Sequence, residues 1–214
     1  MLLAHHPDAI AHLRTPSERD PWRVLVSGCL AAWPCGVKGD DNGLGAVLGD
    51  LLSLPTLRAL PFCPEQHALG TPRTMPDLHG GDGVDALLGR ARVLDEHGED
   101  LTEKMLAGAR AMLDFARANG SELAILTDMS AACGSQVISE GCRLVPIRKF
   151  QKGVGVATAL LLDAGIPIVS QRDFRTLARL RARLDPGYVA PCDLRDHHEH
   201  PWTLEHLPHP HPRA

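Results

Sequence analysis

The amino-acid sequence predicts an α/β fold, namely a three-layer, Rossmann-like, mostly parallel sheet of about four to five strands with helices on both faces. Apolar, β-branched runs of strand length recur along the chain, and segments with helical apolar spacing lie between them. Hydrophobic residues make up 44% of the chain, which is enough for a packed core. Strands that alternate with helices in this way form a parallel sheet that is covered on both faces.

The expected strands are short aliphatic runs that end in small or turn-forming residues, at 23–27, 57–62, 123–127 and 165–170. The expected helices have apolar residues three or four positions apart, at 45–54, from Asp100 or Thr102 to about Asn119, at 157–164 and at 173–184. Pro64 directs the chain out of the sheet, and Pro and Gly mark the following segment 66–83 as loop. Residues 84–93 fit a short helix or, near their end, an edge strand, and segment 136–150 fits neither pattern clearly.

Composition divides the chain into three parts. Residues 1–22 predict an N-terminal arm, residues 23–192 the α/β domain, and residues 193–214 a His- and Pro-rich C-terminal tail. Six of the twelve histidines lie in this tail, at positions 197, 198, 200, 206, 209 and 211. A His-rich tract can bind divalent metals, but a solvated tail interrupted by prolines is the interpretation we favour.

The charge and hydropathy of the chain exclude several classes of protein. A net charge of −4 argues against a generally basic surface for long nucleic acids. No apolar run approaches the ~20 residues that cross a bilayer, so no membrane partner is expected. The first 22 residues make a poor signal peptide, because His and Asp interrupt a very short apolar stretch. We therefore expect a soluble, cytoplasmic protein.

Six cysteines occur without a C-x-x-C motif, at positions 29, 35, 63, 133, 142 and 192. Cys29, Cys63 and Cys133 each come shortly after an expected strand. They should therefore share the rim where the carboxyl ends of parallel strands meet and where such sheets bind ligands. Thiolates select zinc, copper(I) or iron–sulfur clusters, and a site with three protein ligands keeps a position open. The alternative is that they are three small buried hydrophobic residues, and the pattern alone favours neither.

Two polar residues lie close to these cysteines. Glu65 follows Cys63 by two positions, and Ser130 precedes Cys133 by three. A carboxylate beside a bound ligand can act as a general acid or base, and a serine hydroxyl can orient a substrate or water. The alternatives are a solvated loop glutamate and a turn-forming serine.

Several motifs that occur in order resemble one bacterial family. They are Val26-Ser27-Gly28-Cys29-Leu30, Phe62-Cys63-Pro64-Glu65 with Thr71-Pro72-Arg73, Gly98-Glu99-Asp100-Leu101-Thr102, Ser130-Ala131-Ala132-Cys133-Gly134-Ser135, and Gly153-Val154-Gly155-Val156-Ala157-Thr158-Ala159-Leu160-Leu161. The family was long catalogued as a domain of unknown function, and its characterised members are thiouracil desulfidases. The resemblance covers roughly residues 23–171.

The resemblance implies an iron-sulfur-dependent, non-redox desulfidase that acts on a small thiolated pyrimidine nucleobase or nucleotide. It implies a 4Fe-4S cluster held by Cys29, Cys63 and Cys133, with one open iron that binds the substrate sulfur and makes it a better leaving group. Water then attacks the ring carbon, and sulfide leaves. By the same resemblance Glu65 handles protons and Ser130 orients the substrate. The remaining expected substrate-binding residues lie in the same motifs and are Ser27, Arg73 and Ser135.

Three stretches depart from the family pattern, one of which is the run between Cys63 and Arg73, which is one residue short. Gly36-Val37-Lys38-Gly39 stands where the family commonly has Arg-Tyr-Asp-Gly, and Ser139-Glu140-Gly141-Cys142 replaces a Tyr-Asp-Gly-Thr-Phe-like run. These changes leave the identity of the substrate open. Zinc remains the less favoured metal. A fourth ligand from Cys35 or Cys142 would close the cluster. The alternative function is a non-catalytic iron–sulfur or zinc protein that senses or stores metal or sulfur.

Overall fold

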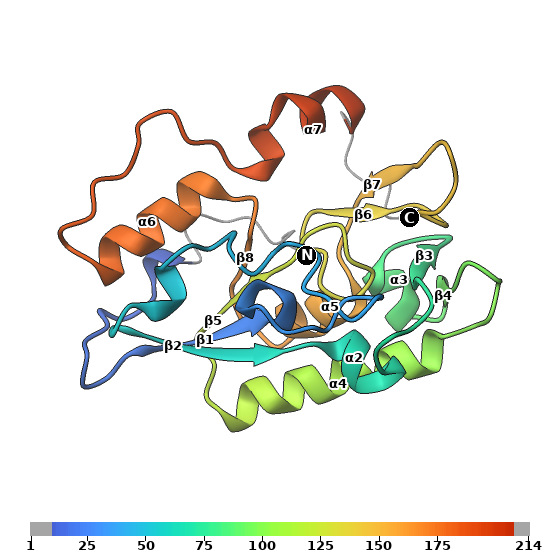
Figure 1. Cartoon of the computed structure of the whole chain (residues 1–214), viewed down its shortest axis with the longest axis horizontal. Coiled ribbons are helices and arrows are strands. Elements are labelled where there is room, and N and C mark those ends of the chain that lie inside the picture. Colours follow the sequence, from blue (N-terminus) through green and yellow to red (C-terminus); the bar gives the residue numbers. More distant parts are fainter. Residues whose placement is uncertain (1–9, 208–214) are drawn as a thin grey trace.

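The structure is a computed structural model that describes residues 10–207 of the 214-residue chain. Its centre is a four-stranded, fully parallel sheet in the order β2-β1-β5-β8. The strands are β1 (Trp22–Ser27), β2 (Leu57–Phe62), β5 (Leu123–Leu126) and β8 (Ile168–Ser170). Helices surround this sheet, so the expected Rossmann-like α/β fold is confirmed (Figure 1).

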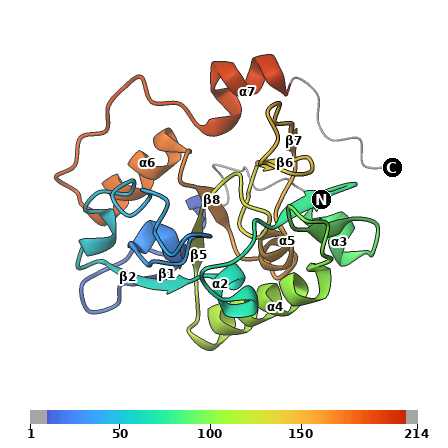
Figure 2. The same cartoon turned by 45° about the vertical axis from the view of Figure 1, so that its right-hand side comes forward.

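Alternate residues of each strand pack on opposite faces of the sheet. Leu25 faces one core with α4 (Thr102–Ala118) and α5 (Val156–Asp163), whereas Val24 faces a second core with α6 (Phe174–Leu184). Figures 1 and 2 show α4 along one side of the sheet and α6 on the opposite side. Met105 and Met112 of α4 are fully buried and belong to the first of these cores.

Two antiparallel two-stranded sheets and several short helices complete the described chain. One sheet pairs β3 (Asp77–His79) with β4 (Arg92–Leu94), and the other pairs β6 (Val137–Ser139) with β7 (Phe150–Lys152). The short helices are α2 (Pro64–Leu69), α3 (Gly83–Leu87) and α7 (Pro201–His206), with 3-10 turns η1 (Gly28–Ala31), η2 (Leu51–Ser53) and η3 (His197–Glu199). Segment 84–93, for which a short helix or an edge strand near its end was expected, contains both, since it includes most of α3 and the start of β4.

Two local predictions are wrong. The helix expected at 45–54 is reduced to turns and η2, since Gly49 takes a left-handed φ of +55° that interrupts a helix. The loop expected after Cys63 contains α2, because Pro64 occupies its first turn, where no amide donor is needed, and the Cys63 sulfur accepts the Gln66 N–H. The same expected loop also contains β3.

The C-terminal segment packs on the domain at least as far as residue 207. Asp196, His197 and Thr203 are buried, and Trp202 meets Phe150 of β7 edge-on at 5.5 Å. The expected solvated character is therefore wrong for these buried residues, whereas His198, His200 and His206 are exposed, and the histidines at 209 and 211 lie outside the described residues. The division of the chain at residues 22 and 192 stays a prediction.

The described part of the N-terminal arm also contacts the domain. Ile10 is buried in the second core, and Arg14 forms an ion pair with Glu122 at 2.6 Å. Within residues 10–207, no helix has the length and apolar character needed to cross a membrane.

Candidate metal centre

A cavity of about 220 Å³ opens at the carboxyl ends of β1, β2 and β5. The chain passes from β1 to β2 on one side and then returns to β5 on the other side of β1. This reversal of strand order lies between β1 and β5, where open α/β sheets bind ligands. Gly28, Phe62 and Thr127, which directly follow or end these strands, all line the cavity.

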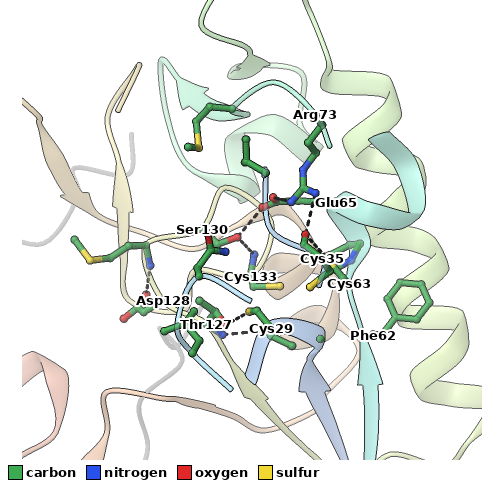
Figure 3. Close-up of a pocket in the computed structure, with 18 of the residues that line it drawn as sticks. Cys29, Cys35, Phe62, Cys63, Glu65, Arg73, Thr127, Asp128, Ser130 and Cys133 are labelled. Atoms are coloured by element: carbon green, nitrogen blue, oxygen red, sulfur yellow. Dashed lines mark hydrogen bonds and ion pairs between the residues drawn. The ribbon is translucent and has the colours of Figure 1, made fainter. Parts of the chain in front are cut away.

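The three cysteines expected on this rim are brought together in the cavity. Cys29, Cys63 and Cys133 line its wall, and Cys35 joins them (Figure 3). The Cys29 sulfur lies 2.9 Å from Thr127 Oγ1, and the Cys35 thiol interacts with the sulfurs of both Cys29 and Cys63. Cys142 does not line this cavity, and Cys192 is exposed.

The thiols differ in how readily they lose a proton. Hydrogen bonding from Cys35 lowers the pKa of Cys29 and of Cys63, although burial opposes this effect. The same hydrogen bonds raise the pKa of Cys35. Burial raises the pKa of Cys133 well above its ordinary value. Because a bound cation favours the thiolate, Cys133 is, among the three expected ligands, the thiol whose ionisation depends most on a positive charge in the cavity.

Glu65 is held between two partners at the cavity wall. One carboxylate oxygen, Oε2, forms an ion pair with Arg73 Nη2 at 2.6 Å, and the other, Oε1, accepts the Ser130 hydroxyl at 2.9 Å. The Ser130 oxygen in turn accepts the Cys133 amide at 3.0 Å. Glu65 and Ser130 therefore form one hydrogen-bonded unit beside the cysteines (Figure 3).

The three expected substrate-binding residues differ in position. Ser27 and Arg73 line the cavity, but the Arg73 side chain is only 5% exposed and also donates to the Cys35 carbonyl at 2.9 Å. Ser135 does not line the cavity, is fully buried, and its hydroxyl has no hydrogen-bond partner within residues 10–207. Contact between Ser135 and a substrate stays a prediction that this position does not favour.

The sequence did not identify two residues of the cavity, and it left a third open. Thr127 contacts Cys29, and Arg143 lines the wall, where it donates to the Met129 carbonyl at 2.8 Å. Cys35, which the sequence offered together with Cys142 as a fourth ligand, lines the cavity with the other three thiols. Cys35 had a signal, because it shares a Gly- and Asp-rich loop with Cys29. Arg143 had none, since only the fold of the β6–β7 hairpin brings it to this wall.

The family model of 2-thiouracil desulfurase matches residues 24–173 of the chain. The chain belongs to this family. Its membership confirms the resemblance drawn from the motifs and the expectation of an enzyme of the desulfidase type. The match ends before α6, so α6 and the C-terminal segment lie beyond it.

Two proteins illustrate the similarity to the desulfurase family. The uncharacterised protein YbbK of Bacillus subtilis (strain 168) is 33% identical over 156 residues, which cover 72% of this chain and 99% of YbbK. A solved structure of the 4Fe-4S-dependent thiouracil desulfidase TudS is 31% identical with a TM-score of 0.61. The match covers 75% of this chain and 98% of the TudS chain.

The residues of the cavity fit an iron–sulfur cluster. Its donors are thiols, the ligands that hold such clusters, and the lowered pKa of Cys29 and Cys63 favours the thiolate form that binds metal. Within residues 10–207, no three His, Cys, Asp or Glu side chains form a group that could hold a metal ion.

Proposed function

We propose that this protein removes sulfur from a thiolated pyrimidine nucleobase or nucleotide in a non-redox hydrolysis. The carbon–sulfur double bond and one water give a carbon–oxygen double bond and hydrogen sulfide, so atoms balance and no electrons are exchanged. The observation that carries the proposal is the cavity itself, which combines three cysteines from three strand ends with the hydrogen-bonded pair of Glu65 and Ser130. TudS, a 4Fe-4S-dependent thiouracil desulfidase, shares this fold.

Cys29, Cys63 and Cys133 would hold a 4Fe-4S cluster. When bound, the cluster supplies an iron with an open position that acts as a Lewis acid toward the substrate sulfur. Cys35 is the neighbouring thiol, and we assign it to the support of Cys29 and Cys63 through its hydrogen bonds.

Glu65 handles the protons in this proposal. Arg73 binds Glu65 Oε2, so Oε1 is the oxygen directed to Ser130. Because two backbone amides donate to Ser130 Oγ, those of Ala132 and Cys133, the serine hydrogen is directed to Glu65. Glu65 Oε1 takes a proton from the attacking water, directly or through Ser130, and returns it to the departing sulfide.

The test begins with anaerobic purification and a count of iron and acid-labile sulfide per chain. About four of each would establish a cluster of the proposed type. The loaded protein is then given 2-thiouracil, 4-thiouracil and their nucleoside monophosphates, and the released sulfide is measured. Cys192→Ser is the matched control for serine substitutions of the cavity cysteines, because Cys192 is exposed and outside the cavity. A stable cluster with no sulfide release from any of these compounds would instead favour the sensing or storage alternative.

A further inference from the structure

Asp128 closes the loop that carries Ser130 and Cys133. It follows Thr127 at the end of β5 and is 4% exposed. Its Oδ1 accepts the backbone N–H groups of Ser135, Gln136 and Val137 at 2.9, 3.1 and 3.1 Å. One carboxylate oxygen therefore joins the beginning of the loop to its end.

The other oxygen of Asp128 binds the C-terminal segment. Asp128 Oδ2 lies 2.5 Å from His197 Nδ1, and Ser170 Oγ donates to the same oxygen at 3.3 Å. Because a carboxylate oxygen only accepts, we assign the donor role to Nδ1 of His197. The His197 side chain is 5% exposed, and its backbone N–H is fixed by Asp173 Oδ1 at 3.0 Å.

His197 lies outside the part of the chain that matches the desulfurase family, which ends at residue 173. The C-terminal segment that carries His197 is nevertheless bound to α6 by hydrogen bonds. Asp196 accepts both the backbone N–H and the hydroxyl of Thr176 on α6, at 2.9 and 2.8 Å. This chain thus supports a loop of the family domain with a residue from beyond that domain.

We propose that His197 is a positioning residue, which acts through Asp128 to fix the loop that presents Ser130 and Cys133 to the cavity. A buried carboxylate keeps its geometry only while its lone pairs have donors, and loss of one donor leaves the remaining hydrogen bonds to rearrange. His197 supplies one of the donors to Oδ2, so its removal should loosen the hydrogen bonds that Oδ1 accepts from the amides of residues 135–137. The link to turnover rests on the proposed function, whereas the link to loop order does not.

Two variants of His197 separate the hydrogen bond from simple packing. His197→Asn keeps a side-chain N–H near the position of Nδ1, and His197→Leu keeps comparable bulk but removes the donor. His198→Leu is the matched control, because His198 is the exposed neighbour in the same 3-10 turn. Amide hydrogen exchange of residues 135–137 reports loop order in each protein without any need for activity. Release of iron from the loaded protein to a chelator reports how well Cys133 is held.

We expect His197→Leu to speed exchange of these three amides about tenfold, to speed iron release, and to lower kcat more than it changes KM. His197→Asn should restore most of the wild-type behaviour, and His198→Leu should resemble wild type. The inference is overturned when His197→Leu exchanges like wild type, or when the Asn and Leu variants are equally loosened. If the variants change amide exchange as expected but the loaded wild-type protein turns over no thiopyrimidine, only the proposed function is refuted.

Discussion

Replacement of Glu65 by Gln removes a carboxylate and keeps nearly the same shape. In the wild-type structure, Oε1 accepts the Ser130 hydroxyl and Oε2 pairs with Arg73. A glutamine can still accept one of these hydrogen bonds, but its amide group cannot take a proton from water. The substitution therefore tests proton transfer while it leaves all four cysteines of the cavity in place.

The expected loss of rate follows from the proposed role. General acid–base catalysis by one side chain contributes about 10²–10⁴-fold, or about 3–5 kcal/mol of activation free energy. We therefore expect kcat to fall within that range. Arg73 would lose its charged partner but keep the Cys35 carbonyl, so the free energy of unfolding should fall by only about 1–3 kcal/mol.

The assay measures sulfide release under anaerobic conditions, with iron and sulfide counted in the same sample. Glu103→Gln is the matched control, because Glu103 is an exposed carboxylate in the first turn of α4. The reasoning is refuted by a Glu65→Gln protein that holds a full cluster and releases sulfide within about threefold of the wild-type rate, less than the smallest expected loss.

Three further predictions concern the cluster, the loop and acid stability. Cys133→Ser should abolish cluster retention, and unchanged iron content would remove Cys133 from the ligand set. Gly155→Ala should reduce iron content, because a Cβ there would lie 2.4 Å from backbone atoms of Ala132 in the cysteine loop; wild-type loading would contradict this contact. Partial burial raises the pKa of Glu122, but hydrogen bonds from Arg14 and a backbone amide outweigh it and lower that pKa overall. The stabilisation is thus present above the unfolded pKa of about 4.3 and lost as pH falls through the folded value, so urea unfolding should show wild type more stable than Glu122→Gln at pH 7 but not near pH 3.

Much of the central sheet could be predicted from local pattern. Strand β2 at Leu57–Phe62 agrees with its expected bounds, and α4 is found where it was expected, although Leu101 occupies its N-cap instead of Asp100 or Thr102. The missed helix α2 shows the limit of this approach. Its six residues carry too little periodicity to stand out, and it is stabilised by a cysteine cap and by packing on α4, where Gly108 approaches the Pro64 carbonyl.

The sequence by itself determined the fold class, the membership of the desulfurase family and the three strand ends that carry Cys29, Cys63 and Cys133. These properties depend on periodicity and on ordered motifs, which are local in the chain. Only the tertiary structure decided that Cys35 joins the thiols, that Ser135 lies outside the cavity, and that His197 reaches Asp128. The physical reason is that such contacts join residues up to 69 positions apart, and no local pattern in the sequence specifies the partner of a buried polar group.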